Sequence, residues 1–394
     1  GFFVLRPIEP FVIGRNIISP HALKDTGFLA CTTEYQATAN GIKFSVEGFP
    51  HSSQDTETIS CAETALWTMM EYFGHKYSDY RTVLPSQIIH TLNKVSSERQ
   101  VPSKGLNIQQ MSFALREFGF GTKIYSRAEY GNDFEGLISC YVESGIPIIT
   151  AMENWPDGNI RHALLCVGHE RISNAQIDNL PACHITDNRL QEAVTAKKIS
   201  MYDIDAVEKP FVFIDDNHPV YQKATLKDPA KHYESGWHDC RIAYFIVPLY
   251  SRIYLEAFEA KNFVKRFLIT GPNPLADGSE VLLRCYLASS RSFKDWLAQN
   301  KSFQNDLKDI ILETSMPKFI WVYELSTKSL VKQKKANGLL ILDATEANIY
   351  FNKPLVIAAF QGKVINFADG LGVLENSEWM LPEFTIFDRN LKPF

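Results

Sequence analysis

The sequence predicts an α+β protein in which a mostly helical half precedes a half made of strands. Two observations carry this prediction. Residues 61–145 contain apolar side chains at the spacing of helices with one buried face, whereas residues 146–249 contain short β-branched and aromatic runs bounded by turn residues. Because helices and strands are segregated along the chain, the pattern favours the α+β class over an alternating α/β protein.

The composition is typical of a globular protein. Hydrophobic residues make up 45% of the 394-residue chain and charged residues 22%, so the chain can bury a large core. The net charge of −5 gives no long-range field that would attract nucleic acid or an anionic membrane, and we expect neither as a partner. No stretch approaches the roughly 18 apolar residues of a spanning helix.

Seven cysteines are scattered along the chain. An odd number at irregular spacing does not suit a disulfide framework, and free thiols indicate a reducing compartment. The opening segment has no basic leader of the kind that signal peptides carry. We therefore expect a cytoplasmic protein, unless a signal peptide has been removed ahead of residue 1.

The chain divides into three segments where its pattern changes. Residues 1–50 show short strand-like runs punctuated by Pro and Gly, and we expect a β-rich lead-in there. Residues 51–250 form the α+β unit. Residues 251–394 start the pattern again, with strands and one helical stretch at 292–314. We expect a separate, strand-rich accessory domain, to which no motif assigns a role and for which binding of a protein partner is one open possibility.

Four helices are expected in the first part of the α+β unit. The strongest pattern begins at Cys61, where apolar residues recur at helical spacing as far as Phe73, and Gly74 is a suitable C-cap. The remaining helices are expected at 86–94, from an N-cap at Asn107 to 118, and at 134–143.

The second part of the unit is expected to form a sheet. β-branched and aromatic runs bounded by turn residues occupy 146–153, 162–170, 211–216 and 242–249. A polar insertion, residues 171–208, lies between the second and third of these runs. We expect it to be a surface excursion.

Four residues supply the groups that a cysteine nucleophile needs. Cys61 begins the most strongly patterned helix, where free N–H groups and the helix dipole favour a thiolate. His162 begins a strand and is the candidate base, and Asp216 ends another strand and is the candidate residue that orients the base. Gln54, seven residues before Cys61, is the candidate oxyanion donor together with the backbone N–H of Cys61.

The orienting acid is one of two neighbours. Side chains alternate along a strand, so Asp215 and Asp216 are expected to point to opposite faces, and only one of them to reach His162. The pattern of a hydrophobic strand, one further residue and then an acid favours Asp216 over Asp215. Asn217 is the next candidate.

Three segments that carry these residues resemble papain-like cysteine peptidases. SQDTETISCAETALWTMMEYFG (53–74) resembles their Gln, short loop, Cys and helix. GIPIITAMENWPDGNIRHALLCVGHE (145–170) resembles their Gly-x-Pro strand, turn and His strand ending in Val-Gly. FVFIDDNHP (211–219) resembles their hydrophobic strand followed by Asp. Within the superfamily the likeness is greatest to bacterial double-glycine peptidases.

The resemblance implies a papain-like fold for residues 50–250 and a bacterial hydrolase that cleaves a peptide or protein through a thioester on Cys61. It implies His162 and Asp216 as the other members of a catalytic triad, Gln54 as the oxyanion residue, and no cofactor. The sequence departs from the family pattern in three respects. The spacing from Gln to Cys is one residue longer, Ala follows the nucleophile in place of the commoner Gly, and a large insertion separates the His from the Asp.

Two other functions stay open. Acyl transferases with the same Cys–His–Asp order resolve the thioester with an amine instead of water, although they do not depend on a Gln at the position of Gln54. A papain-like protein that has lost activity can keep its cleft as a binding module.

Other His, Cys and aromatic side chains near these segments have simpler interpretations. Cys166 shares a strand face with His162, and we expect it to be a core residue. His218 is expected in a turn, and Trp155 on or over the wall of the cleft. A further set could be imagined as zinc ligands, but its spacing matches no zinc motif and we expect no metal. The members of this set are Cys183, His184, His232, His238 and Cys240.

Overall fold

The protein is a mixed α+β protein with several antiparallel sheets, which confirms the predicted class. The computed structural model describes residues 1–7, 13–55, 59–96, 100–101, 105–155, 157–158, 161–234, 236–271, 274–360, 362–368, 372–375 and 383–394.

The first large sheet contains the strands that the sequence predicts for the α+β unit at residues 51–250. Its strands run in the order β11-β10-β8-β7-β12-β6, with β3 beside the end of β8 and β21 beside β3. All of these pairings are antiparallel. The strands are β3 (Phe28–Ala30), β6 (Phe120–Ser126), β7 (Ile148–Asn154), β8 (Arg161–Glu170), β10 (Phe211–Ile214), β11 (Gln222–Ala224), β12 (Cys240–Tyr250) and β21 (Lys392–Pro393).

The second large sheet is formed mainly by the C-terminal part of the chain. Its order is β19-β18-β17-β16-β14-β13-β9, and only the β13–β9 pair is parallel. Its strands are β9 (Ser200–Asp203), β13 (Glu280–Ser289), β14 (Phe319–Ser326), β16 (Gly338–Asp343), β17 (Leu355–Phe360), β18 (Lys363–Asn366) and β19 (Gly372–Glu375). A short pair, β15 (Lys335–Ala336) and β20 (Phe384–Thr385), lies apart from these strands.

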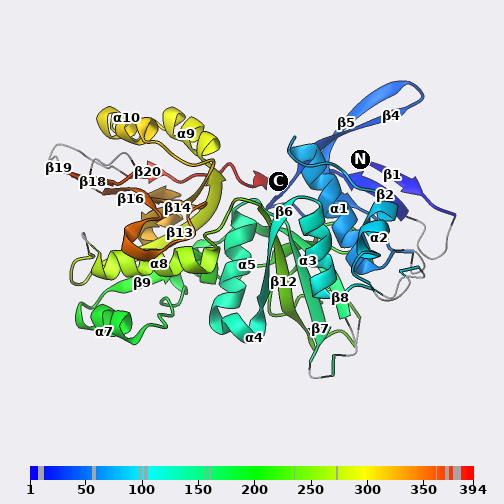
Figure 1. Cartoon of the computed structure of the whole chain (residues 1–394), viewed down its shortest axis with the longest axis horizontal. Coiled ribbons are helices and arrows are strands. Elements are labelled where there is room, and N and C mark those ends of the chain that lie inside the picture. Colours follow the sequence, from blue (N-terminus) through cyan, green and yellow to red (C-terminus); the bar gives the residue numbers. More distant parts are fainter. Residues whose placement is uncertain are drawn as a thin grey trace.

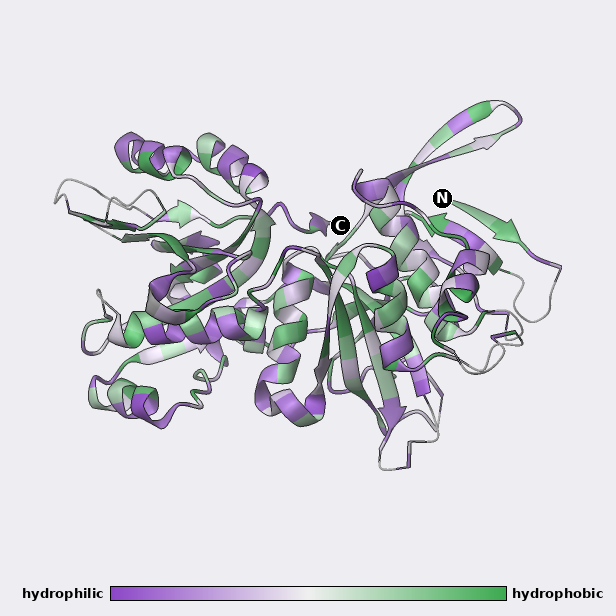
Figure 2. Ribbon diagram, in the orientation of Figure 1, coloured by the Kyte–Doolittle hydropathy of each residue, from purple (hydrophilic) through white to green (hydrophobic). Residues whose placement is uncertain are grey.

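The N-terminal lead-in is rich in strands, as predicted. β1 (Phe2–Leu5), β2 (Ile13–Ile18), β5 (Ile42–His51) and β4 (Thr33–Ala39) form a further sheet in that order. The β4–β5 hairpin projects from the body of the molecule (Figure 1), and Figure 2 shows hydrophobic positions along it. Residues 8–12 of this lead-in lie outside the described residues.

The helices are distributed between the two large sheets. They are α1 (Cys61–Lys76), α2 (Pro85–Leu92), α3 (Ile108–Glu117), α4 (Arg127–Tyr130), α5 (Phe134–Glu143), α6 (Asn174–Asp178), α7 (Asn188–Ala196), α8 (Ala257–Thr270), α9 (Ser290–Gln299), α10 (Asn305–Glu313) and α11 (Lys328–Lys332). Short 3₁₀ turns are η1 (Pro20–Ala22), η2 (Gly131–Asp133), η3 (Ile204–Ala206) and η4 (Tyr350–Asn352). Among the described residues, no helix is both long and apolar enough to span a bilayer.

The sheets and helices stack in layers (Figure 1). α1, α2 and α3 pack on one face of the first sheet through buried residues such as Leu66 and Leu115. α5 and α8 contribute to a second core, which also contains side chains of both large sheets, for example Tyr141 of α5, Phe263 of α8 and Trp321 of β14. α9 and α10 cover the other face of the second sheet. Each of these helices therefore buries one face, as its periodicity requires.

The domain boundary expected near residue 250 coincides with a change of sheet, but one hydrophobic core extends across it. β12 ends at Tyr250 and strands of the second sheet follow, so the change of sheet falls where the sequence pattern changes. One core nevertheless joins α5 and β7 to α8, β13 and β14. The insertion 171–208 is not the expected surface excursion, because its strand β9 forms the edge of the second sheet beside β13. The C-terminal strand β21 returns to the first sheet beside β3.

Gly74 does not end the first helix, contrary to the prediction. α1 continues to Lys76. Gly74 allows the chain at Thr82 to pack closely against the helix, because a Cβ at residue 74 would lie 2.4 Å from the backbone N of Thr82. The prediction for α3 is confirmed: the side chain of Asn107 accepts a hydrogen bond from the backbone N of Gln110 at 2.8 Å.

Two parts of the helical prediction were incomplete. α8 was not predicted, although its buried residues Ala260, Phe263, Val264 and Phe267 recur at helical spacing. The single stretch expected at 292–314 consists of two helices, α9 and α10.

Candidate active site

Cys61 is the first residue of α1. Ser60 is the N-cap: its backbone N donates to Glu63 Oε2 at 3.1 Å, and its hydroxyl donates to the same carboxylate. This capping arrangement fixes the point at which the helix begins. Buried residues of α1, including Leu66 and Met69, hold the helix in a core shared with β8. The half-exposed Cys61 therefore lies at a fixed helix N-terminus, where the helix dipole favours a negative charge on sulfur.

β8 carries His162 into the same site. The side chain of His162 is 3% exposed, and its Nε2 lies 2.9 Å from Asp215 Oδ1. Burial opposes protonation of the ring, but hydrogen bonds to Asp215 and Cys61 outweigh it and hold the pKa of His162 well above its usual value. Because Asp215 engages Nε2, Nδ1 is the ring nitrogen left to face Cys61.

The acid that bonds to His162 is Asp215, which corrects the prediction of Asp216. The expectation that only one of the two acids could approach the ring was also wrong, since Asp216 Oδ1 lies 3.5 Å from His162 Nε2. β10 ends at Ile214 and a turn begins at Asp216, so alternation extends to Asp215 but does not fix the direction of the Asp216 side chain.

A β-bulge explains why Asp215 takes the place expected for Asp216. Phe211 pairs with His169 on β8, but beyond the bulge Phe213 pairs with Cys166, so the register has shifted by one residue. If the pairing of Phe211 with His169 were extended without the shift, Asp216 would lie opposite Leu164. The side chain of Leu164 is on the same face of β8 as that of His162, two residues before it. With the shift, Asp215 occupies that position.

Four hydrogen bonds hold the Asp215 carboxylate. Oδ1 accepts from His162 and, at 3.0 Å, from the backbone N of Asn217. Oδ2 accepts from Nε2 of His232 at 2.9 Å and from the hydroxyl of Tyr233 at 2.6 Å. Burial favours the neutral acid, but the hydrogen bonds, that of His162 first, hold the pKa of Asp215 far below its usual value. Asp215 is therefore an ionised partner for the imidazole at neutral pH.

A buried histidine supports the backbone of Asp215. His51 Nε2 lies 2.9 Å from the carbonyl oxygen of Asp215, and His51 Nδ1 lies 2.8 Å from Nδ2 of Asn16. Because a carbonyl oxygen can only accept, Nε2 of His51 carries the proton and Nδ1 accepts from the Asn16 amide. Burial lowers the pKa of His51, in agreement with a neutral ring. The sequence analysis did not single out His51, although it lies three residues before Gln54.

Asp216 lies near His162 and Cys61 without a hydrogen bond of its own. Neither of its carboxylate oxygens has a hydrogen-bond partner among the described residues, and Oδ1 faces the His162 ring at 3.5 Å. It lines a small cavity together with Cys61, Thr64 and Ala163. Burial raises the pKa of Asp216 to about 7, in spite of the opposing charge of His162. At neutral pH this acid is therefore partly protonated, in contrast to Asp215.

Two aromatic side chains pack against His162. Trp237 meets the imidazole edge-on with 5.6 Å between ring centroids, and Tyr233 does so at 6.0 Å. The two aromatic rings stack on each other at 4.0 Å. They shield the His162–Asp215 hydrogen bond from water, which strengthens it. The sequence analysis missed this role, although the aromatic segment KHYESGW precedes β12 closely.

Gln54 reaches the site through Asn217. Its Nε2 donates to Oδ1 of Asn217 at 2.5 Å, and Nδ2 of Asn217 donates to the hydroxyl of Tyr233 at 3.2 Å. The Gln54 amide thus lies beside the loop that follows Asp215. Residues 56–58, between Gln54 and Cys61, lie outside the described residues, and contact between Gln54 and the oxyanion position stays a prediction.

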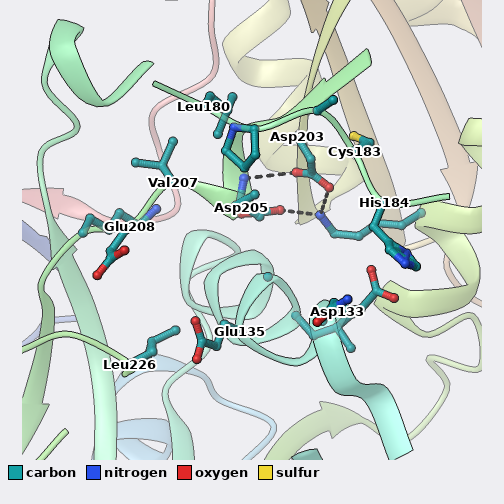
Figure 3. Close-up of a pocket in the computed structure, with 18 of the residues that line it drawn as sticks. Asp133, Glu135, Leu180, Cys183, His184, Asp203, Asp205, Val207, Glu208 and Leu226 are labelled. Carbon is teal, nitrogen blue, oxygen red and sulfur yellow. Dashed lines mark hydrogen bonds and ion pairs between the residues drawn. The ribbon is translucent and has the colours of Figure 1, made fainter. Parts of the chain in front are cut away.

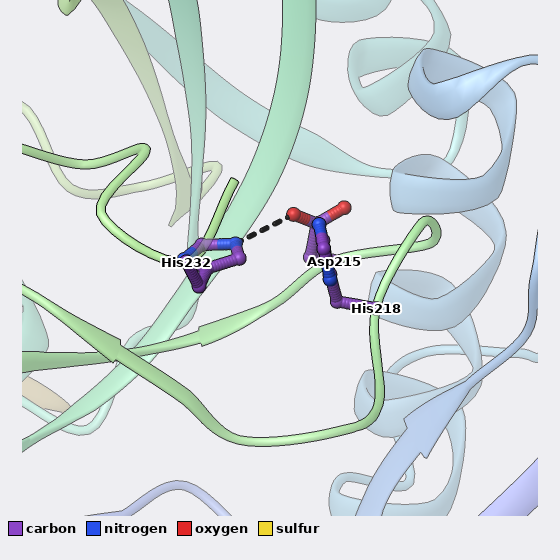
Figure 4. Close-up of side chains that lie close together, drawn as sticks. All are labelled: Asp215, His218 and His232. Atoms are coloured by element: carbon purple, nitrogen blue, oxygen red, sulfur yellow. Dashed lines mark hydrogen bonds and ion pairs between the residues drawn. The ribbon is translucent and has the colours of Figure 1, made fainter. Parts of the chain in front are cut away.

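Asp215, His218 and His232 form a close group (Figure 4), in which one ligand atom of each lies within 4.8 Å of the others. Such a group could hold a metal ion. However, Asp215 Oδ2 already accepts from His232 and Tyr233, and the ring of His218 packs edge-on against Tyr233 at 4.3 Å. Within this group His232 supports Asp215 through a hydrogen bond, while Nδ1 of His232 is buried and has no hydrogen-bond partner among the described residues.

The zinc set considered from the sequence is not assembled. In the described part of the chain, the groups with metal-compatible spacing contain none of its members except His232. Cys240 is buried in β12 and His238 is exposed. Cys166 is a buried core residue, as predicted. Trp155 is 61% exposed.

Comparison with known proteins adds nothing to this geometry. No protein-family model matches the chain, and neither does any curated protein. The function of the site has to be argued from its own contacts: a helix-terminal Cys61, the buried His162 and the ionised Asp215.

Proposed function

We propose that the chain is a cysteine-nucleophile hydrolase with a papain-like arrangement, which cleaves an amide bond in a peptide or protein. The observation that carries the proposal is the position of His162. One ring nitrogen binds the ionised Asp215, and hydrogen bonding to Cys61 helps to raise the pKa of the ring. A ring that holds its proton beside a thiol at a helix N-terminus favours a thiolate–imidazolium pair.

Each group has a distinct part in the proposed reaction. The Cys61 thiolate attacks the amide carbon and forms a carbon–sulfur bond. His162 gives its proton to the leaving nitrogen as the carbon–nitrogen bond breaks, which leaves a thioester. His162 then takes a proton from the water that attacks the thioester, and the acid product departs from the restored thiolate. Asp215 keeps the proton on Nε2 and the ring in its orientation throughout.

The oxyanion of the tetrahedral intermediate needs donors beside Cys61. The backbone N–H of Cys61, in the first turn of α1, has no acceptor within its own helix. The Gln54 amide has a second N–H besides the one that it donates to Asn217. We therefore assign these two groups as the donors.

A thiol-labelling experiment tests whether Cys61 is activated. Iodoacetamide is applied to the full chain between pH 5 and 9, and labelled cysteines are identified by mass spectrometry. Cys61 should react rapidly even at pH 6, because the proposed thiolate–imidazolium pair holds the sulfur as the reactive anion. Cys183 is the internal control: it is the other half-exposed cysteine, and burial raises the pKa of its thiol to about 12.

Two outcomes of this experiment separate enzyme from binding module. Labelling of Cys61 that falls sharply in His162→Ala supports the enzyme. Labelling of Cys61 no faster than that of Cys183 at any pH would contradict activation and favour an inactive binding module.

Hydrolase and transferase differ in what resolves the thioester. A peptide library is incubated with the chain in the presence and absence of a primary amine, and the products are analysed by mass spectrometry. Free carboxyl products in both samples support the hydrolase. Products that form only as amine conjugates would assign the site to an acyl transferase instead.

A further inference from the structure

A cavity of about 590 Å³ shares no lining residue with the Cys61 site. Its walls come from η2, the first turn of α5, α6, the 180–184 segment, β9, η3 and α8 (Figure 3). The volume is in the range of sites that hold small molecules. Part of the wall is apolar, with Leu180, Val207 and Leu226 around the space that Figure 3 shows.

Most of the charges in the wall are paired. Lys261 Nζ lies 2.7 Å from Asp203 and 2.6 Å from Asp205. At the rim, Lys227 pairs with Glu208 at 2.7 Å. Glu135 pairs with Arg127 at 3.0 Å. The charges of these residues are neutralised by these ion pairs, so only a few charged groups of the wall are free to bind a ligand.

Lys209 is a buried cation of the wall for which the described structure records no ion pair. It is 3% exposed, and no described residue gives it a hydrogen bond or an ion pair. Its ammonium lies 5.5 Å from the ring centroid of Phe211, which also lines the cavity. Burial lowers the pKa of Lys209, which reflects the cost of an unpaired charge. Lys265, 7% exposed, donates at 3.2 Å to the carbonyl oxygen of His184 and has no carboxylate partner in the described structure.

An acceptor lies close to these cations without being joined to Lys209. Asp205 is 4% exposed; its Oδ2 bonds to Lys261, but its Oδ1 is buried and has no donor among the described residues. The charges of Lys209 and Asp205 influence each other although no ion pair joins the two groups. Asp133, half-buried at the wall, is a further carboxylate with no described partner. The cavity wall thus contains an unpaired donor and an unpaired acceptor, beside an apolar part, and the charges of Glu143 and Asp205 both act on the donor Lys209.

We propose that this cavity binds a small zwitterion of the amino-acid or short-peptide class. The carboxylate of the ligand accepts from Lys209, its ammonium donates to Oδ1 of Asp205, and its apolar side chain packs against Leu180, Val207 and Leu226. A simple anion would leave Asp205 Oδ1 without a donor, and a simple cation would leave Lys209 unpaired. The proposal does not depend on the chemistry of Cys61.

Calorimetric titration of the full chain tests this with three ligands that share a side chain. Leucine carries both charges, N-acetylleucine only the carboxylate, and leucinamide only the ammonium. We expect leucine to bind and each blocked form to bind at least about tenfold more weakly, because each loses one charge-assisted hydrogen bond. Inorganic phosphate is the fourth ligand. Binding of phosphate and N-acetylleucine as tightly as leucine would overturn the zwitterion in favour of a plain anion.

Substitutions connect the binding to the cavity. Lys209→Met should weaken leucine binding at least about tenfold, whereas Lys227→Met, at the rim and already paired with Glu208, should leave it unchanged. Circular dichroism confirms that the variants are folded, and Lys209→Gln replaces Lys209→Met if the latter is not. Unchanged affinity in a folded Lys209 variant, or no binding of leucine to the wild-type chain at millimolar concentration, would show that the cavity is not such a site.

Discussion

Replacement of Asp215 and Asp216 by asparagine, one at a time, tests the proposed site most directly. Asp215→Asn removes the ionised partner of His162, so the imidazole loses its orientation and its preferred tautomer. We expect amide or ester hydrolysis to slow by about 10²–10⁴-fold, in line with the loss of the triad acid in other enzymes. Asp216→Asn should slow it less than about tenfold, because a buried, partly protonated acid resembles the amide in shape and charge.

The stability effects follow from the same contacts. The four hydrogen bonds to Asp215 come from His162, Asn217, His232 and Tyr233, two to each oxygen. An asparagine amide presents one group that cannot accept, so two of these donors lose their acceptor whichever way the amide is turned. At about 1–3 kcal/mol for each unsatisfied buried donor, Asp215→Asn should lower the free energy of unfolding by about 2–6 kcal/mol.

The assay has to separate lost catalysis from lost fold. Hydrolysis rates are measured well below the melting temperature of each variant, and urea unfolding gives the folded fraction. The iodoacetamide rate of Cys61 supplies a second readout that needs no substrate. If Asp216→Asn proves inactive while Asp215→Asn keeps more than a tenth of the rate, the acid that serves His162 is Asp216 and our reading of the β-bulge is wrong.

Three further predictions concern stability, the oxyanion and the sheet. The pKa of Asp216, about 7 in the folded chain, exceeds the roughly 3.9 of an unfolded carboxyl, so this group contributes stability that is lost as pH rises from 4 to 7. The free energy of unfolding of the wild type, measured in urea, should therefore fall relative to that of Asp216→Asn over this pH range, and a constant difference between the two would contradict this. Gln54→Ala should lower kcat by about 10²–10³-fold with little change in stability, and an unchanged rate would remove Gln54 from the oxyanion site. Gly168→Ala should destabilise the chain by more than about 3 kcal/mol in thermal unfolding, because the added Cβ would lie 2.0 Å from the carbonyl oxygen of Leu29. Gly136→Ala is the matched control, since no atom lies nearer than 3.9 Å to its added Cβ. Equal melting temperatures for the two variants would refute the close approach of β3 to Gly168.

Much of the fold was readable because local patterns agree with it. The α+β class, the helix from Cys61, the cap at Asn107 and the strand at 162–170 each follow from periodicity or from one capping side chain. Such features depend on neighbours within one or two turns of the chain. Gly74 misled the prediction because the same residue type suits both a helix end and a close approach, and only Thr82, folded against it, distinguishes the two.

The remaining fold features depend on contacts that are distant in sequence. β9, in the polar insertion, pairs with β13, which lies about 80 residues further along the chain. α8 lies in a core shared by both large sheets. Local sequence patterns do not indicate which sheet edge a strand will join or between which sheets a helix will pack. These positions are determined by the packing of complete helices and strands against one another.

By itself the sequence determined which residue types stand where: a cysteine at a helix start, a histidine at a strand start and an acid at a strand end. Tertiary structure alone decided which acid meets the ring, since a one-residue bulge in β8, at Val167, shifts its pairing with β10 and sets Asp215 rather than Asp216 on the face of His162. It also brought His232 and Tyr233 to the carboxylate of Asp215, and His51, from a distant segment, to its backbone carbonyl. The physical reason is range: helix and strand signals act over a few residues, whereas hydrogen-bond partners and burial are set by chain segments that meet only after folding.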